Sequence, residues 1–456
     1  MLPLRQDWLH RPTHRQVWIL AIPMIASNLT VPLVSLVDSI VAGHLSHPGQ
    51  LAAVAVGSAV YGVPIWVFGF LRMGTIGFAS QASGRADGDA LRLLLLQALL
   101  LALGLAVGTV LLSLPLLDPL VRVMKASATL DALTLGYLRV RLLGLPAALV
   151  NAAMVGWYLG MHNASMALRV TVVTNVVNIV LNLIFVLELH AGVPGIAAAS
   201  VCGEWIGACV GLAGISRQLV RYPGKLHAHL MRSAAAWRPL LAVNRDILIR
   251  SLALQGVFFA VTVLGARLGD GVVAANALLL NGLLLSAFAL DGLANAVEAL
   301  AGHAVGARDR QGLRRALVVA GGWSLIGGVL FALLFTVAGR IFIDLQTNMA
   351  PVRIIAYRYL PYLAVLPLVG VWSYLLDGLF VGATRAKEMR DTMLFAGAIF
   401  VLLALGLHSL GNHGLWLAFL GFMLARAVSM GWMARRITRR DGWFDGAGGA
   451  CAASLG

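Results

Sequence analysis

A single carboxylate lies in the first long apolar stretch of the chain, residues 15–42, and that acid is Asp38. The stretch is long enough to cross a bilayer, because about 20 helical residues cover the hydrocarbon core. An ionisable group inside a membrane is costly and marks function by default. Pro23 and Pro32 share the stretch, and a proline inside a helix removes a backbone hydrogen bond and bends the helix. These residues suit a helix that moves when its acid binds a proton; the alternative is that Asp38 lies in the headgroup region and only caps or pairs.

Amides on a later apolar segment are the natural partners of this acid. Within the segment 163–188, the stretch TVVTNVVNIVLNLIFVL (171–187) carries three asparagines at spacings of three and four, which share one helical face: Asn175, Asn178 and Asn182. An amide in lipid without a partner is costly, so this face should look inward, toward Asp38. Asn151 and Ser200, on the neighbouring segments, can complete the cluster. The alternative is that the asparagines only hold helices together, as polar residues do in membranes.

The second half of the chain carries a further set of polar residues inside its apolar segments. They are Gln255, Asp291, Glu298 and Asp377. Acids in this position can bind a cationic substrate or a second proton. Alternatively they pair with Arg72 or Arg426, which would make them structural. The sequence leaves both interpretations open, because it does not say which faces meet.

The composition identifies the class of protein. Of 456 residues, 60% are hydrophobic and 12% are charged, against about 25% charged in soluble domains, and the mean hydropathy is +0.87. The net charge of +15 would suit a nucleic-acid-binding protein. However, the basic residues lie in short loops between apolar runs, as the positive-inside rule predicts for membrane proteins. We therefore expect an integral membrane protein with the lipid bilayer as its partner and no nucleic-acid partner.

Apolar segments follow one another along the chain, separated by turn residues or charges. We count twelve: 15–42, 51–80, 90–114, 131–159, 163–188, 193–217, 243–267, 271–303, 313–337, 350–382, 390–410 and 413–436. The basic loops predominate on the side that holds the amino end, which predicts that both termini are cytoplasmic. We expect lobes at 1–217 and 243–436, a cytoplasmic linker at 218–242 and a disordered cytoplasmic tail at 437–456.

The two halves of the chain repeat each other. Asp87 in the first half corresponds to Asp309 in the second, 222 residues later, and GMHNASMALR (160–169) corresponds to GATRAKEMR (382–390). Folds built from such repeats place their binding sites between the repeats, near the bilayer midplane. We therefore predict an all-α membrane protein with twelve transmembrane helices in two pseudo-symmetric six-helix lobes around a central cavity.

Several chemistries have no support in the sequence. It has no phosphate-binding signature for ATP, so transport would draw on an ion gradient without a cofactor. The histidine pairs His44 with His47 and His408 with His413 have no accompanying carboxylate, so we expect no metal site. No catalytic arrangement stands out, and we expect that the protein is not an enzyme.

Long polar motifs within the apolar segments are specific enough to suggest a family. They are PMIASNLTVPLVSLVDSIVAGHL (23–45), FLRMGTIGFASQASG (70–84), NVVNIVLN (175–182), LAVNRDILIRSLALQ (241–255), ALDGLANAVEA (289–299) and VGVWSYLLDGLFVGATRAKEMR (369–390). With these motifs the chain resembles the multidrug and toxic compound extrusion (MATE) family, in its DNA-damage-inducible F (DinF) branch. The resemblance covers essentially all of residues 15–440.

The resemblance implies a monomeric antiporter of the bacterial inner membrane that exports organic cations or amphiphilic drugs by alternating access. Asp38 matches the family's essential first-helix carboxylate, and Pro23 matches the proline at which that helix bends. The positions around the carboxylate match Asn151, Asn178 and Ser200.

The chain departs from the family pattern at two positions. Asn182 stands where many relatives carry a second carboxylate, and Gln255 stands where some sodium-coupled relatives have an acid. A sodium site would lose a negative ligand, and hard cations prefer charged oxygen ligands. We therefore expect proton rather than sodium coupling. The alternatives are a flippase for lipid-linked oligosaccharides from the same superfamily, which would need a more cationic cavity, and a membrane-embedded transferase, which would need a catalytic set at one membrane face.

Overall fold

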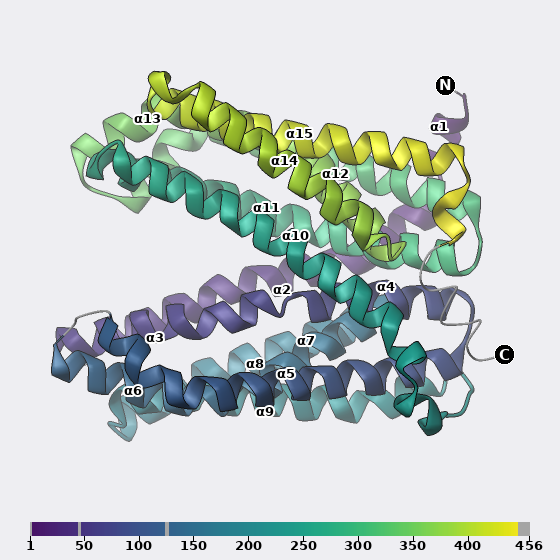
Figure 1. Cartoon of the computed structure of the whole chain (residues 1–456), viewed down its shortest axis with the longest axis horizontal. Coiled ribbons are helices and arrows are strands. Elements are labelled where there is room, and N and C mark those ends of the chain that lie inside the picture. The colour runs from purple at the N-terminus through teal and green to yellow at the C-terminus, as the bar shows by residue number, and fades with distance from the viewer. Residues whose placement is uncertain (1, 44–46, 124–126, 446–456) are drawn as a thin grey trace. The chain divides into compact units, whose positions relative to one another are not determined.

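The computed structural model describes residues 2–43, 47–123 and 127–445, and these residues form helices and turns without a strand (Figure 1). The first half of the chain contains α1 (Leu2–Trp8), α2 (Arg11–Gly43), α3 (Pro48–Val67), α4 (Phe70–Gly84), α5 (Gly88–Val123), α6 (Ala128–Leu142), α7 (Leu145–Gly160), α8 (Ala164–Leu183) and α9 (Gly192–Leu219). The second half contains α10 (Ala234–Arg267), α11 (Asp270–Gly306), α12 (Arg310–Gln346), α13 (Ala350–Gly382), α14 (Ala386–Gly406) and α15 (Asn412–Arg439). The predicted all-α class is confirmed.

The lengths and compositions of these helices are those of a multi-pass membrane protein. Within the described residues, 10 helical segments are long and apolar enough to cross a membrane, with α3 and α4 counted together. The pair α6 and α7, bent by 47°, makes an eleventh if it is one span. The remaining predicted span, 15–42, falls on α2, a helix of 33 residues. Each of the predicted segments therefore coincides with a helix or a helix pair.

The chain divides into two compact units, which we call the first lobe (Ala26–Trp237) and the second lobe (Met1–Ile25 with Arg238–Gly456). The predicted boundaries differ from this division at the amino end, because the first 25 residues group with the second lobe. Polar and aromatic contacts explain this grouping. Asp7 on α1 forms ion pairs with Arg314 and Arg315 on α12 at 2.7 and 3.6 Å, and Trp323 donates a hydrogen bond to His14 at 2.9 Å.

Helix α2 is continuous in sequence across the division between the lobes. Its residues up to Ile25 group with the second lobe, and its residues from Ala26 onward group with the first. The division falls two residues after Pro23, which lacks the backbone hydrogen bond to the carbonyl four residues earlier and so weakens the preceding turn of the helix. Bending at Pro23 and Pro32 stays a prediction, but the first of them lies where the two lobes share one helix.

The predicted linker 218–242 is largely part of the first lobe. Arg92 on α5 donates hydrogen bonds to the Tyr222 carbonyl at 2.8 Å, and Asp89 pairs with His227 at 2.8 Å. Gln97, also on α5, donates to the carbonyl of Ala236 at 3.0 Å. These bonds satisfy backbone groups that would otherwise be left open in an irregular segment. The connection is therefore held to the lobe as far as Trp237.

The predicted disorder of the tail 437–456 is wrong for its first part. Helix α15 extends to Arg439, and a short 3-10 turn follows at Gly442–Asp445. Trp443 is buried and donates a hydrogen bond to Thr438 at 2.8 Å. A buried tryptophan supplies enough apolar area to order a short segment. Residues 446–456 lie outside the described part of the chain.

The internal repeat is visible in the backbone of four turns that join helices. Each turn has one non-glycine residue with positive φ: Ala86 (54°), His162 (58°), Arg308 (54°) and Thr384 (55°). In each, the amide that follows bonds back to a carbonyl five residues earlier, at 2.8–3.0 Å. This hydrogen bond is typical of the Schellman motif, in which a right-handed helix ends with one residue in the left-handed conformation.

The same turns also begin the next helix in the same way in both lobes. Asp87 accepts a hydrogen bond from the Ala90 amide at 2.9 Å, and Asp309 accepts one from the Gly312 amide at 2.8 Å. A side-chain oxygen that accepts such a bond caps a helix start. Because the equivalent turns are 222 residues apart, the two lobes share one local design.

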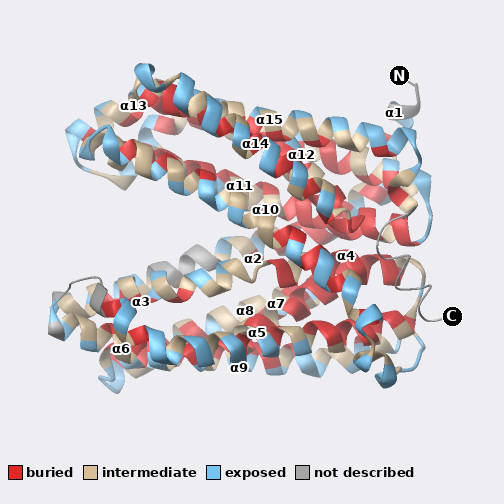
Figure 2. Cartoon of the chain, viewed as in Figure 1, coloured by how far each residue is buried: buried red, intermediate tan, exposed pale blue. Residues whose placement is uncertain are grey.

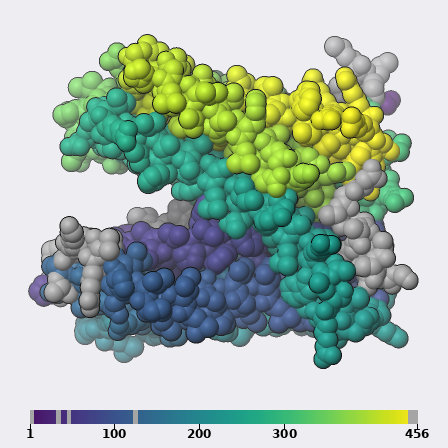
Figure 3. Space-filling view, viewed as in Figure 1, coloured from purple at the N-terminus to yellow at the C-terminus, as the bar shows by residue number. Residues whose placement is uncertain are grey.

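The outward surfaces of the helices are apolar. Figure 2 shows buried, intermediate and exposed residues interspersed along α5, and the exposed ones include Leu111, Leu112 and Leu114. In the space-filling view, side chains from this part of the chain form a continuous layer over the face of the first lobe (Figure 3). In water such a surface would promote aggregation, whereas in a bilayer it contacts lipid.

Candidate functional site

The acid predicted to carry the chemistry is held by one asparagine. Within the first lobe, the amide nitrogen of Asn182 on α8 donates a hydrogen bond to Oδ1 of Asp38 on α2 at 2.6 Å. Asn182 is fully buried and Asp38 is half-buried. A hydrogen bond to an ionised acceptor is about twice as strong as a neutral one. The structure therefore brings the acid of α2 and the amide face of α8 together.

The other predicted members of the cluster have different partners. Asn178 donates to the Ser200 hydroxyl on α9 at 2.7 Å, and Asn175 donates to the Thr30 hydroxyl on α2 at 2.7 Å. Asn151 on α7 donates to the backbone carbonyl of Glu204 at 2.8 Å. Among the predicted residues that the structure describes, Asn182 alone contacts the carboxylate directly, and the other members of the predicted cluster form three separate hydrogen bonds. Two of these fix α8 against α2 and α9, which sets the position of Asn182, and the third joins α7 to α9.

Three buried amide oxygens near this site have no hydrogen-bond donor among the described residues. They are Oδ1 of Asn151, Asn178 and Asn182. Buried polar atoms are normally paired, and an orphan calls for an explanation. A protonated carboxyl group can donate to an amide oxygen. Asn182 is therefore able to bind ionised Asp38 through its NH₂ group and, after the amide rotates by half a turn, protonated Asp38 through its oxygen.

A buried ion pair lies in the same lobe and was missed by the sequence analysis. Arg141 on α6 contacts Glu204 on α9 at 3.0 Å, with side chains that are 11% and 13% exposed. The hydroxyl of Tyr61 on α3 donates to the same carboxylate at 3.4 Å, and the Arg141 guanidinium lies 3.9 Å from the Tyr61 ring centroid. Tyr137, one turn before Arg141, bonds to Ser58 at 2.9 Å.

Arg141 links this pair to Asp38. The guanidinium interacts electrostatically with Asp38, and its Nε and NH1 atoms are buried without a hydrogen-bond acceptor among the described residues. An arginine with spare donors that interacts with two carboxylates can stabilise either of them. The signal for this pair was visible in the sequence, since Arg141 and Glu204 are charges inside apolar segments. The rule that singled out Asp38 applies equally to them.

The second lobe holds its own buried charge cluster. Oδ2 of Asp377 on α13 accepts hydrogen bonds from Arg250 on α10 and from Arg426 on α15. All three side chains are at least nine-tenths buried. Asp291 and Glu298 on α11 interact electrostatically with Arg250. The pairing of Asp377 with Arg426 was one of the two interpretations left open by the sequence, whereas the role of Arg250 was missed.

The remaining predicted residues differ in their burial. Gln255 is exposed on α10, and Arg72 is half-buried on α4 in the first lobe. Asp377 is buried whereas Gln255 is exposed, so these two residues do not belong to one site in the second lobe. Within the described residues, no group of three or more His, Cys, Asp and Glu side chains is placed to hold a metal ion.

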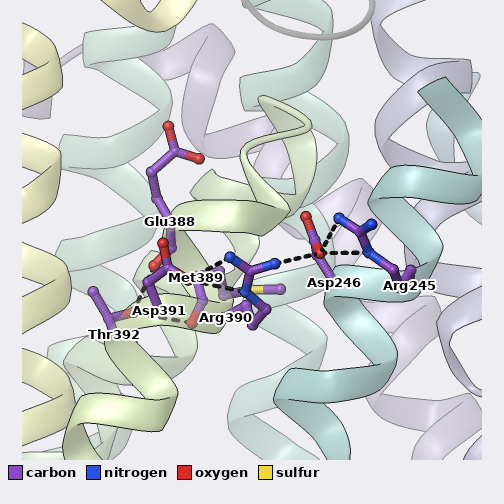
Figure 4. Close-up of polar contacts among 7 residues, drawn as sticks. All are labelled: Arg245, Asp246, Glu388, Met389, Arg390, Asp391 and Thr392. Carbon is purple, nitrogen blue, oxygen red and sulfur yellow. Dashed lines mark hydrogen bonds and ion pairs between the residues drawn. The ribbon is translucent and has the colours of Figure 1, made fainter. Parts of the chain in front are cut away.

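Two motifs that suggested the family meet in the second lobe. Arg390 on α14 donates to Asp246 on α10 at 2.8 Å, and Asp246 also accepts from its neighbour Arg245 at 3.0 Å (Figure 4). Arg390 bonds to Asp391 at 2.6 Å as well. Asp246 is buried, so its two arginine partners are needed to compensate its charge. The contact between Arg390 and Asp246 joins the start of α14 to α10.

Apolar helices long enough to span a bilayer, with carboxylates and arginines buried among them, define the class of polytopic membrane transporters. The family model described as MatE matches residues 23–184 and 247–405. The chain belongs to this family, the multidrug and toxic compound extrusion family. Membership confirms the predicted family and identifies the protein as a multi-pass membrane transporter.

Curated relatives match over nearly the whole chain. It is 43% identical over 432 residues to DNA damage-inducible protein F of Escherichia coli (strain K12), covering 94% of each chain. It is 24% identical over 455 residues to the probable multidrug resistance protein NorM of Rhizobium meliloti (strain 1021), covering 94% of this chain and 95% of that protein. Of these two relatives, DNA damage-inducible protein F is the more similar, in agreement with the predicted DinF branch.

Solved structures share the fold. A MATE protein in its bent conformation aligns with a TM-score of 0.85 at 22% identity, covering 96% of this chain and 97% of that chain. A MOP superfamily transporter from Pyrococcus furiosus aligns with a TM-score of 0.82 at 23% identity, covering 93% and 96%. At this level of identity the alignments establish the architecture, and the chemistry has to be argued from the residues of this chain.

Proposed function

We propose that this transporter exports small amphiphilic or cationic molecules in exchange for protons, with Asp38 as the proton-binding group. The observation that carries the proposal is the hydrogen bond between Asp38 and Asn182 at 2.6 Å. It places an ionisable acid in a half-buried position on a membrane helix, where its charge is costly unless compensated. Proton binding removes that charge and changes the hydrogen bond that joins α2 to α8.

The consequence for conformation follows from the position of α2. The ionised acid binds the Asn182 amide as a charge-assisted acceptor, and the neutral acid binds it more weakly. Since α2 contributes residues to both lobes, a change in how it is held in the first lobe acts on the helix that they share. Proton and substrate are coupled only if each favours a different conformation.

Two features of the site support protons over sodium. Asn182, which donates a hydrogen bond to Asp38, is neutral. The acid and this partner therefore offer a bound cation a single negative charge. The nearby Arg141 guanidinium repels a bound cation. The unpartnered amide oxygens favour sodium, since hard cations bind neutral oxygen ligands. A full charge close to the site outweighs them, because ion–dipole interactions are weaker than charge–charge interactions at similar distance.

The location and assembly follow the same reasoning. The positive-inside rule favours both termini in the cytoplasm. We propose the bacterial inner membrane as the location, as for the bacterial relatives, and a monomer as the transporting unit. Neither a flippase nor a transferase has a specific observation in its favour.

The experiment that tests the proposal uses purified protein in liposomes with a fluorescent cationic substrate and an imposed proton gradient. Asp38→Asn should abolish proton-driven transport, because the amide cannot exchange a proton. Asp118→Asn is the matched control: this carboxylate is 43% exposed and pairs loosely with Arg139 at 3.5 Å in the same lobe. Undiminished proton-coupled transport by Asp38→Asn would contradict the proposal.

A further inference from the structure

A second polar site lies in the first lobe, away from Asp38, at the opposite end of α8 from Asn182. A cavity of about 530 Å³ opens between the start of α8 and the end of α9, two helices that pack along each other (Figure 1). Its lining includes three arginines, Arg169, Arg217 and Arg221, together with Asn163, Ser165 and Gln218. No aspartate or glutamate lines it. A concave site with three positive charges and no compensating acid is suited to an anion.

The three arginines have spare binding capacity. The side chain of none of them forms an ion pair or a hydrogen bond with another described residue, in contrast to the side chain of Arg92, which donates to backbone carbonyls in the same lobe. Arg217 lies in the last turn of α9, and Arg221 lies two residues beyond the end of that helix. Both line the same cavity, where like charges repel each other. An anion that bridges them would remove this repulsion.

A buried donor in the same cavity also lacks an acceptor. Gln218 is 4% exposed; its oxygen accepts a hydrogen bond from Asn163 at 2.8 Å. Its Nε2 atom is buried without a partner. Leaving a buried donor unsatisfied costs free energy. An anionic oxygen in the cavity would satisfy it, so this donor is a second, independent indication of a ligand.

The local helix geometry adds to the positive potential. Helix α8 begins at Ala164, and Asn163 accepts a hydrogen bond from the Met166 amide at 3.1 Å. The amino end of a helix carries a partial positive charge and attracts phosphate groups. The hydroxyl of Ser165 lies in the same first turn and lines the cavity.

We propose that this cavity binds the phosphate headgroup of an anionic phospholipid. The site is at one end of two segments that are long and apolar enough to span a bilayer, 164–188 and 192–219. Basic pockets between transmembrane helices at the cytoplasmic side are suited to anionic headgroups, and the positive-inside rule predicts that this end is cytoplasmic. Apolar side chains on α9 and just beyond it are exposed next to the cavity, including Leu212 (46%) and Val220 (82%). They offer a surface for the acyl chains that a free phosphate would not use.

The test measures lipid binding to the purified full-length protein in a neutral detergent. Thermal unfolding and native mass spectrometry are recorded with dioleoyl phosphatidylglycerol, with dioleoyl phosphatidylcholine and with inorganic phosphate. We expect phosphatidylglycerol to raise the unfolding temperature and to remain bound in the mass spectrometer. Phosphatidylcholine and phosphate should have little effect at matched concentration.

The variant Arg169→Gln/Arg217→Gln/Arg221→Gln should bind phosphatidylglycerol more weakly by a factor on the order of a hundred, since each basic residue near an anionic headgroup contributes severalfold. The matched control removes three exposed arginines from the second lobe, Arg267→Gln/Arg308→Gln/Arg435→Gln, and should keep the affinity of the unaltered protein. Gln218→Leu should weaken binding without changing the net charge, which separates a built site from general attraction.

Three outcomes would overturn the proposal. The first is an equal loss of binding in both triple variants. The second is equal protection by phosphatidylcholine, and the third is full protection by inorganic phosphate, which would identify a free anion as the ligand. Binding is measured without a gradient or an exported substrate, so the result is independent of the function proposed for Asp38.

Discussion

At the scale of single residues, Asp38 is one member of a set of coupled charges. Asn182 binds one of its oxygens, and Arg141, which also pairs with Glu204, interacts with it electrostatically. Asp38 was recognisable from sequence as an acid in an apolar segment. The arginine was not assigned to it, because its segment lies about a hundred residues further along the chain and only folding brings the two together.

Replacing Arg141 with glutamine should change how transport depends on pH. The variant removes a positive charge that interacts electrostatically with Asp38, so the pH of half-maximal transport should shift from that of the unaltered protein. The measurement is dye efflux from liposomes over a range of external pH. Arg139→Gln, two residues away and 61% exposed, should leave the profile unchanged; an identical profile for both variants would mean that Arg141 is only structural.

Asn182→Asp tests the choice of ion. A second carboxylate next to Asp38 adds a negative ligand, and cation sites of this type gain affinity with each charged oxygen. We expect transport by the variant to become more dependent on sodium than transport by the unaltered protein. The measurement is efflux driven by a sodium gradient at constant pH. If both proteins respond equally to sodium, the charge of residue 182 does not select the ion.

Asp377 is expected to matter for stability. Asp377→Asn leaves Arg250 and Arg426 buried without their shared carboxylate, and breaking a buried ion pair in this way costs about 3–5 kcal/mol. Thermal unfolding in detergent should show a large decrease in unfolding temperature. The exposed pair of Asp118 with Arg139 is worth about 1 kcal/mol or less, so Asp118→Asn serves as the control. A similar small shift in both variants would show that the second-lobe cluster tolerates the loss of its acid.

At the scale of elements, the helix-joining turns show how closely the two lobes correspond. Four turns share one backbone conformation, with a residue near φ = +55° before the next helix. The sequence predicted part of this, since Asp87 and Asp309 stand at equivalent positions. It did not predict that Ala86, His162, Arg308 and Thr384 adopt a conformation that normally favours glycine. Those residues accept it because the bonds on either side of each turn fix the backbone.

The aspartates that cap α5 and α12 should contribute similarly in both lobes. Asp87→Ala and Asp309→Ala each remove a side-chain acceptor for a helix amide, at a cost of about 0.5–2 kcal/mol. The free energy of unfolding in a denaturant titration should fall by similar amounts in the two variants. Asp87→Asn and Asp309→Asn keep a capping oxygen and should lie close to the unaltered protein. A loss confined to one of the two alanine variants would contradict the equivalence of the turns.

At the scale of the whole molecule, the helical segments were predictable because burial in a bilayer demands apolar residues over a known length. Every helical segment in the described residues that is long and apolar enough to cross a membrane falls where the hydropathy of the sequence predicted a span. The limits of the lobes were less predictable. Residues up to Ile25 join the second lobe through Asp7, His14 and Trp323, although they precede the first lobe in sequence.

The tail and the linker were also less predictable from the sequence than the helical segments. Composition rich in glycine and alanine predicted disorder, yet Trp443 is buried and orders the segment around it. The 218–242 connection contains polar residues that suit a loop, but Arg92 and Asp89 bind it to α5. In both cases a few specific contacts outweighed the average properties of the segment.

The sequence by itself determined the all-helical membrane class, the family, the internal repeat and the place of Asp38 as an acid inside an apolar segment, because each of these depends on local composition, spacing or motif. Only the tertiary structure decided which amide binds Asp38, that Arg141 and Glu204 pair beside it, and that two arginines share Asp377. The physical reason is that a charge buried in an apolar bundle must find a partner. Which partner it finds depends on how the helices pack, and residue spacing along one helix does not contain that information.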